Sequence, residues 1–495
     1  MLWPEMWLRA TGQNLFEKSA FYRTTPDYLL YLIMPAGHWL ANDGDGPMDS
    51  LGGLGYSFAP DAVTFHFYGW RNKNPYARWL ARHMSGWPHA NIERLWQAIL
   101  WADHSKEEKP LNDLPPVKFF SSNGVAILRS GWDLSAKSGD IVAAFYCRPF
   151  ESHTHYNAGD FMIWRGLDEL VCRGGYYMGT ENTYHHNFFI RTVAHNCALI
   201  YDPNEPVPFY GKFMMANDGG QLRGDPACYP NSYRLLMGNN PFFYRGEIRT
   251  FVDDPQFTYL FADVTPAYNA TKAVRVARAF LWLKPSTFVI CDWATSTKPQ
   301  FAKRWLLHSA NKPSVAGAEK VVTGTSDAGI LESTDSHFVT LQRGASKLSL
   351  QTPLPEHAVI RRIGGEGFGF WVDGKNWEPP ATTREFMEGK RKDFEAAEAT
   401  KRFWRIEIEP TEQSAEAVFL NVLDATAKDG KTPPVAALLR REKAAGVTLK
   451  RGDASHEALF YPDGRVRVDG KTVGQSLEPL KPYVVPERLG SPGKP

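Results

Sequence analysis

Residues 277–295 read ARAFLWLKPSTFVICDWAT, a β-rich apolar stretch broken by a proline, and runs of this kind decide the fold. The other main runs are VAILRSGWD (125–133), DIVAAFYCRP (140–149), DFMIWRG (160–166), DELVCRGG (168–175), CALIYD (197–202) and RFWRIEIEP (402–410). Short strands punctuated by Gly, Pro and Asp indicate a large antiparallel β-sandwich. The runs are not separated by crossover helices, which argues against a parallel α/β sheet.

The chain before the sandwich has a helical period instead. In NIERLWQAILWAD (91–103), apolar residues recur every three or four positions, which predicts an amphipathic helix. Asn74 followed by Pro75 predicts the N-cap and first residue of a second helix, PYARWLARHM. The apolar stretch YLLYLIMPAGHWLA, from Tyr28, is too short to span a membrane and predicts a core helix.

These patterns divide the chain into three parts. The charged, proline-bearing segment HSKEEKPLNDLPP has no apolar period, so we place a boundary there, between a helical domain at 1–115 and a sandwich domain at 116–410. Residues 411–495 form a small C-terminal β extension, in which two Asp-Gly pairs predict hairpin turns, followed by a disordered tail.

Composition narrows the function classes. Lys and Arg total 56 against 54 Asp and Glu, and the net charge of +2 argues against nucleic acid as a partner. Five cysteines in 495 residues cannot form a disulfide scaffold. The first residues, MLWPEMWLRATG, lack the features of a secretory signal.

Histidines cluster in one part of the predicted sandwich. His153 and His155 stand at i and i+2 on a predicted strand, so both rings leave the same face, and His195 heads a later strand. Three imidazoles brought together in this way can bind a metal or share acid–base work. His185 and His186 are adjacent, so they point apart in an extended segment, and we expect both to be loop residues.

A second interpretation of the same stretch is a cupin-like metalloenzyme. HTHYNAGDFMIWRG loosely matches a first cupin motif, with Asp160 in place of the usual glutamate and Gly166 closing the motif. This alternative predicts a metal-dependent oxygenase or isomerase in a small barrel. It lacks the expected upstream glycine and a second motif.

The stretches FESHTHYNAGDFMIWRGLDELVCRGGYY (150–177) and FFIRTVAHNCALIYD (188–202) resemble the heparinase II/III-like polysaccharide lyases, in their heparinase II-like branch. The likeness extends over about residues 20–425. It implies an (α/α) toroid, incomplete in this chain, followed by antiparallel β-sandwich domains. It also implies β-elimination of a uronic-acid-containing polysaccharide, glycosaminoglycan or alginate-like, by a periplasmic or secreted lyase.

The resemblance assigns roles to individual residues. His153 matches the catalytic histidine, and Tyr177 matches an aromatic position that we expect to act with it. His155 and His195 match the histidine ligands of a structural zinc, while the elimination itself needs no cofactor. The residues that we expect to bind the acidic polysaccharide are Asn157, Arg173, Tyr184 and Arg191.

The sequence departs from the family pattern at two places, and each departure leads to a further expectation. Arg173 stands where the zinc-binding members have an aspartate, and a guanidinium cannot ligate a cation. We therefore expect Arg173 to replace the metal while His155 and His195 make hydrogen bonds. The toroid segment that supplies a tyrosine in relatives is short here, which leaves a non-catalytic acidic-glycan-binding protein as an alternative. The tyrosine candidates are Tyr22, Tyr28, Tyr56 and Tyr68.

Overall fold

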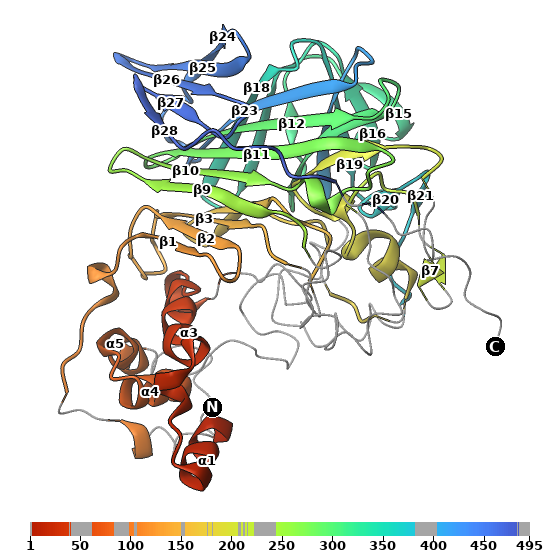
Figure 1. Cartoon of the computed structure of the whole chain (residues 1–495). Helices are drawn as coiled ribbons and strands as arrows, with labels where there is room; N and C mark the ends of the chain where they lie inside the picture. The colour runs from red at the N-terminus through yellow and green to blue at the C-terminus, as the bar shows by residue number, and fades with distance from the viewer. Residues whose placement is uncertain are drawn as a thin grey trace, which may run out of the picture.

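The computed structural model describes residues 2–38, 40, 62–83, 99–102, 106–149, 154–175, 177–180, 182–205, 209–210, 213–214, 216–221, 244–381, 403–482 and 484. Short helices lie on one side of a stack of antiparallel sheets (Figure 1). The predicted antiparallel β-rich architecture is confirmed, whereas the toroid stays a prediction. Within the described ranges, no helix is long and apolar enough to cross a membrane.

The N-terminal helices are α1 (Leu2–Thr11), α2 (Leu15–Lys18), α3 (Ala20–Tyr31), α4 (Ala62–Arg71) and α5 (Pro75–His83). The predicted cap of α5 is confirmed, because Asn74 Oδ1 accepts the backbone N–H groups of Tyr76 and Ala77, each at 3.0 Å. The predicted core helix from Tyr28 is wrong beyond Tyr31, where α3 ends. Pro35 explains this end, since it holds Met34 in extended backbone. Most of the predicted helix at 91–103 lies outside the described residues.

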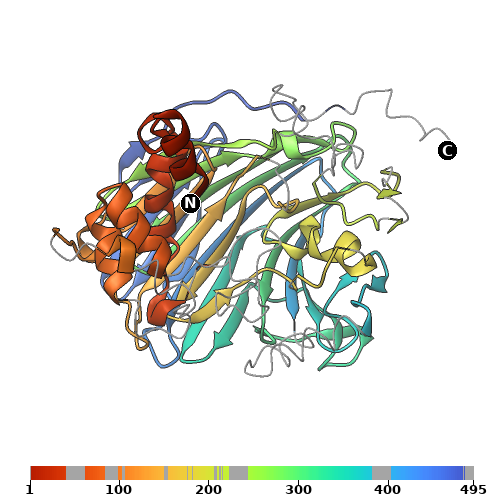
Figure 2. The same cartoon turned by 90° about the horizontal axis from the view of Figure 1, so that it is seen from below.

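A five-stranded sheet lies between the helices and the rest of the molecule (Figures 1 and 2). Its strands are β1 (Val117–Phe120), β2 (Val125–Arg129), β3 (Ile141–Tyr146), β4 (Asp160–Arg165) and β5 (Asp168–Val171). Ile127 and Ala144 pack against the helices, whereas Phe145 and Phe161 face the sandwich core. Both faces are covered, which is why β2 and β3 are buried at every position rather than at alternate ones.

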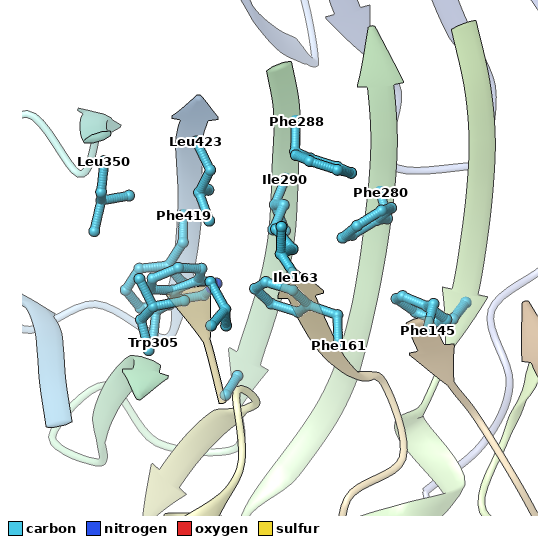
Figure 3. Close-up of a cluster of buried hydrophobic side chains, with 14 of the residues drawn as sticks. Phe145, Phe161, Ile163, Phe280, Phe288, Ile290, Trp305, Leu350, Phe419 and Leu423 are labelled. Carbon is cyan, nitrogen blue, oxygen red and sulfur yellow. The ribbon is translucent and has the colours of Figure 1, made fainter. Parts of the chain in front are cut away.

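Two larger sheets enclose the main core. The eight-stranded sheet runs β14 (Ser314–Val315), β17 (Phe338–Arg343), β18 (Ser346–Leu354), β23 (Glu416–Ala427), β12 (Thr287–Ser296), β11 (Ala273–Leu283), β10 (Phe257–Asp263) and β9 (Glu247–Asp253). The six-stranded sheet runs β15 (Lys320–Gly324), β16 (Gly329–Ser333), β19 (Ala358–Gly364), β22 (Trp404–Pro410), β13 (Ala302–Ser309) and β6 (Ala198–Tyr201). Figure 3 shows Phe161, Phe280 and Trp305 meeting from three different sheets.

The C-terminal sheet packs on the outer face of the eight-stranded sheet. It comprises β24 (Val435–Arg441), β25 (Ala444–Arg451), β26 (Ala454–Phe460), β27 (Val466–Val468) and β28 (Lys471–Val473). The predicted boundary after residue 410 needs correction, because β23 pairs with β12 and β18 at the centre of the large sheet. The extension therefore begins with β24. Residues 485–495, predicted to be a disordered tail, lie outside the described residues.

Two small hairpins complete the strand pairings. One pairs β20 (Trp371–Val372) with β21 (Lys375–Asn376), and the other pairs β7 (Phe209–Tyr210) with β8 (Phe213–Met214). The predicted Asp-Gly turn at 469–470 is confirmed between β27 and β28, where Asp469 and Gly470 both have positive φ. This is the backbone conformation that a two-residue hairpin loop requires.

Candidate active site

Two of the clustered histidines meet in a buried chain of hydrogen bonds with Asp160. Nδ1 of His155 lies 3.1 Å from Nε2 of His195, and Nδ1 of His195 lies 3.0 Å from Oδ2 of Asp160. All three side chains are at most 2% exposed. The structure thus brings His155 and His195 together, but their predicted placement on strands is wrong. His155 lies in the connection before β4, and His195 follows the 3₁₀ turn Thr192–Ala194. His153 and Tyr56 lie outside the described residues.

Asp160 begins β4 and is the ionised end of this chain. Its Oδ1 accepts the backbone N–H groups of Phe161 (2.8 Å) and Asn196 (2.9 Å), and the amide of Asn157 is 3.4 Å from Oδ2. Burial raises the pKa of Asp160, but the hydrogen bonds from His195 and these neighbours outweigh it and hold the pKa below its usual value. Asp160 is therefore a carboxylate at neutral pH.

Asn196, directly after His195, fixes three segments around the histidines. Its Nδ2 donates to the carbonyls of Phe161 and Cys172, each at 2.8 Å, and its Oδ1 accepts the backbone N–H of His308 at 2.8 Å. The side chain is fully buried, and its donors and acceptor are all used. Asn196 therefore holds β4, the end of β5 and β13 in register beneath His195.

A second buried carboxylate, Asp292, stabilises the same region through its ion pair with Arg278. Arg278 on β11 donates through Nε to Asp292 on β12 at 2.6 Å, and through Nη1 to the carbonyls of Gly159 and Asn196. Trp305 donates its indole N–H to the other oxygen of Asp292 at 2.9 Å. Arg278 thus fixes the backbone on both sides of the Asp160–His195 contact.

His308 is a further buried histidine that the sequence patterns did not select. Its Nε2 lies 2.9 Å from the carbonyl of Val193, and its Nδ1 lies 3.2 Å from Oδ1 of Asn196. Burial, Arg405 and His195 lower the pKa of His308 to about 3, so the ring is neutral.

Sequence spacing could not find His308, Arg278 or Asp292, because more than 80 residues separate them from Asn196. The Asn of the Ala-His-Asn motif and the Asp that opens β4 were the available signals.

The expectation that His185 and His186 are loop residues is wrong. Both are buried in a π-helical turn, His185–Phe189, with their ring centres 5.0 Å apart. This turn carries Phe189 against His155, with ring centres 4.6 Å apart and planes nearly perpendicular. A π-helical turn is rare and is found mainly where function requires an unusual side-chain placement. The apolar neighbours of this turn explain its burial, which adjacency in sequence does not reveal.

The remaining predicted site residues lie around Phe189. The guanidinium carbon of Arg173 is 5.3 Å from the centre of this ring, and the Tyr177 ring is 6.3 Å from it. Tyr184 is fully buried and stacks on the same ring at 5.9 Å. Tyr177 is only partly buried. Arg173 and Tyr184 are therefore buried around Phe189, whereas Tyr177 is partly exposed beside them.

Arg191 and the toroid tyrosines lie elsewhere. Arg191 is buried in an ion pair with Asp218, which also accepts the backbone N–H of Val193 at 3.2 Å. Burial raises the pKa of Tyr68 to about 12. Tyr28 meets Phe120 edge-on, with ring centres 5.0 Å apart. Tyr22, Tyr28 and Tyr68 belong to the core that the helices share with the five-stranded sheet.

The donor set does not fit a structural zinc. Such sites have four ligands, which are usually Cys or His with occasional carboxylates. Across the described ranges, no three His, Cys, Asp or Glu side chains are grouped so that they can hold an ion. His155 and His195 supply two nitrogens, and Arg173 occupies the position where a third ligand was expected.

The fold and the buried histidine–carboxylate site define a β-sandwich protein with an N-terminal helical domain. A family model described as heparinase II/III-like, C-terminal, matches residues 112–367, just over half of the chain. The chain belongs to the heparinase II/III-like family, and the cupin-like alternative is set aside. No curated protein sequence matches the chain significantly.

Solved structures agree at the level of fold. The heparinase III BT4657 gene product with methylated lysines superposes with a TM-score of 0.54 and 11% identity, and the match covers 90% of this chain and 55% of that one. A crystal structure of heparinase III gives a TM-score of 0.53 and 12% identity, covering 92% of this chain and 57% of the other. The chain therefore spans little more than half the length of these two proteins.

Proposed function

We propose that this protein is a polysaccharide lyase that cleaves a uronic-acid-containing polysaccharide, glycosaminoglycan or alginate-like, by β-elimination. One observation carries the proposal: His155 and His195, which are 40 residues apart in the sequence, meet in a buried chain that ends on an ionised carboxylate. Membership of the heparinase II/III-like family supports the reaction class. Active sites characteristically combine buried titratable groups with specific charge partners.

The chemistry explains why such residues are needed. The hydrogen at C5 of a uronate is a weak acid until the adjacent carboxylate is neutralised by hydrogen bonds or positive charge. A base must then remove this proton, and an acid must protonate the departing O4. Histidine and tyrosine suit these tasks because both can accept and return a proton.

We assign the roles as follows. His153 acts as the catalytic acid or base, or aligns the substrate, and its position two residues before His155 ties it to the buried chain. Tyr177, partly exposed beside His185, is the second catalytic candidate. The burial of Asn157, Arg173, Tyr184 and Arg191 favours a role in shaping and charging the site over direct contact with the polymer. The reaction needs no cofactor.

The experiment is a substrate screen with a matched pair of variants. The purified protein is incubated with heparin, heparan sulfate, chondroitin sulfate, hyaluronan and alginate, and the ultraviolet absorbance of the unsaturated uronate product is followed. We expect activity on at least one polymer and a loss of about 100-fold or more for His153→Ala, the usual size of an acid–base contribution. His357→Ala, at an exposed histidine directly before β19, should leave the rate unchanged.

Two results would count against the proposal. Binding of an acidic polysaccharide without any unsaturated product would favour the non-catalytic glycan-binding alternative. Full activity of His153→Ala would remove His153 from the mechanism and shift the assignment to Tyr177.

A further inference from the structure

The hairpin of β20 and β21 places a lysine over a tryptophan ring at the surface of the protein. Nζ of Lys375 lies 4.2 Å from the centre of the Trp377 ring, and Lys375 is exposed while Trp377 is partly exposed. This cation–π contact keeps the charge close to the indole. Among the residues that the structure describes, no carboxylate lies within ion-pair distance of the ammonium. Lys375 can therefore pair with an anion from outside the chain.

Three hydrogen bonds hold this hairpin in place. The indole N–H of Trp377 donates to a carbonyl of β20 at 3.2 Å. The carbonyl of Trp371 accepts Nη2 of Arg405, on β22, at 3.1 Å. At the turn, Asp373 accepts the hydroxyl of Tyr201, the last residue of β6, at 3.3 Å. The lysine and the indole are thus mounted on a supported strand pair, and such elements position binding groups more precisely than loops do.

The hairpin also packs against the π-helical turn of the candidate active site (Figure 1). Phe370, directly before β20, meets the Tyr184 ring edge-on with ring centres 4.9 Å apart, and Tyr184 stacks on Phe189. Trp377 and Tyr177 are both partly buried against the hydrophobic cluster to which these three residues belong. The hairpin and the catalytic candidate Tyr177 therefore lie beside one packed cluster.

We propose that Lys375 and Trp377 form a sugar-binding subsite, in which the ammonium pairs with the carboxylate of a uronate and the partly exposed indole contacts the sugar ring. The inference deepens the proposed function and rests on it for the class of ligand. Every polymer of that class carries uronate carboxylates, whereas only some carry sulfates. An ammonium has three N–H donors and no acceptor, so it suits a carboxylate that approaches from different angles.

The position of the hairpin assigns this subsite to binding rather than to the chemical step. Phe370 and Tyr184 lie between the hairpin and Phe189, the ring that packs against His155. Lys375 therefore holds a sugar unit away from the reacting bond. Its loss should weaken binding of the polymer and leave the elimination step unchanged.

The test is binding of acidic polysaccharides to the whole chain, measured by affinity electrophoresis in gels that contain heparin, hyaluronan or alginate. Lys375→Met keeps an unbranched apolar side chain and removes the charge. We expect it to bind about fivefold or more weakly than the wild type, as the loss of one charge-assisted hydrogen bond predicts. Lys375→Arg keeps a cation over the indole and should bind within about twofold of the wild type. A wild type that binds none of the three polymers would overturn the proposal.

Lys298→Met is the matched control. Lys298 is exposed between β12 and β13, and its Nζ lies 5.5 Å from the ring centre of Phe301. Each methionine variant loses one positive charge and one cation–π contact, so the effects of net charge and of this contact on stability are matched. We expect Lys298→Met to bind like the wild type. Equal weakening by the two variants would overturn the subsite.

The choice of polymer identifies the anion that Lys375 holds. Hyaluronan and alginate carry carboxylates without sulfates, whereas heparin with its carboxylates reduced to alcohols carries sulfates alone. We expect Lys375→Met to weaken binding to carboxylate-bearing polymers and to bind carboxyl-reduced heparin as the wild type does. An equal loss on carboxyl-reduced heparin would assign Lys375 to sulfate and overturn the carboxylate subsite.

Kinetics separate this proposal from the lyase function. On a polymer that the wild type cleaves, Lys375→Met should raise KM and leave kcat within about twofold. Binding that depends on Lys375, without any unsaturated product, would reject the lyase function and keep the subsite. Unsaturated product with KM and affinity unchanged in Lys375→Met would keep the lyase function and reject the subsite.

Discussion

Two buried carboxylates, Asp160 and Asp292, stabilise the backbone around Asn196, Asp160 directly and Asp292 through Arg278. They differ in their charge partners. Asp292 pairs with Arg278, a permanent cation, and accepts the indole of Trp305. Asp160 pairs with His195, an imidazole rather than a permanent cation. The first pair can only hold the sheets together, whereas the second can take part in chemistry. Burial raises the pKa of Asp292, while hydrogen bonds keep the pKa of Asp160 low.

Removing the permanent cation should have the largest effect on stability. Arg278→Met leaves Asp292 buried without a counter-charge and deprives the carbonyls of Gly159 and Asn196 of their donor. We expect a loss of about 3–5 kcal/mol in the free energy of unfolding, measured by urea denaturation. The double variant with Asp292→Leu should recover part of this loss. A loss below about 1 kcal/mol would show that the pair does not hold the site.

Asn196 contacts both buried carboxylate networks, since its backbone N–H donates to Asp160 and its carbonyl accepts from Arg278. A substitution at Asn196 therefore disturbs both networks. In Asn196→Asp, the carboxylate cannot donate to the carbonyls of Phe161 and Cys172, which remain buried. We expect a loss of about 2–4 kcal/mol, since each unsatisfied buried group costs about 1–3 kcal/mol. The exposed Asn311→Asp, measured in the same denaturation series, should change stability little. Equal stability of the two variants would contradict the joining role.

Acid titration sharpens the comparison between the carboxylates. The pKa of Asp160 is lower in the folded protein than its ordinary value of 3.8, so its ionised form stabilises the fold at neutral pH. This contribution is lost as the pH falls through the folded pKa. We expect the stability gap between wild type and Asp160→Asn to narrow below about pH 4. Denaturation curves between about pH 5 and pH 3 measure this difference in the free energy of unfolding. A difference that stays constant would contradict the lowered pKa of Asp160 in the folded protein.

The smallest expected effect concerns metal. If His155 and His195 hydrogen-bond to each other as the structure has them, zinc gains no complete ligand set, and neither zinc nor EDTA should shift the melting temperature. Differential scanning calorimetry with and without each reagent measures this. A zinc-dependent rise that His195→Gln abolishes would instead restore the metal role.

The features that the sequence predicted correctly are those that neighbouring residues determine. The Asn74 cap and the Asp469-Gly470 turn both follow from neighbouring residues, and the structure has them. The clustering of histidines in the sequence predicted that His155 and His195 meet, but strand alternation is not the cause, because neither residue lies on a strand. Arg278 and His308 could not be foreseen, since their partners depend on strand order. The π-helical turn at His185 was missed because burial of both histidines depends on tertiary packing.

The central claim is that this chain performs an elimination. Mass spectrometry of the oligosaccharides released from an acidic polysaccharide tests it most directly, because elimination leaves a double bond at the new non-reducing end and hydrolysis adds a water there. The account predicts unsaturated ends formed by the wild type and lost in His153→Ala. Saturated ends, or no cleavage of any of the five polymers, would contradict it.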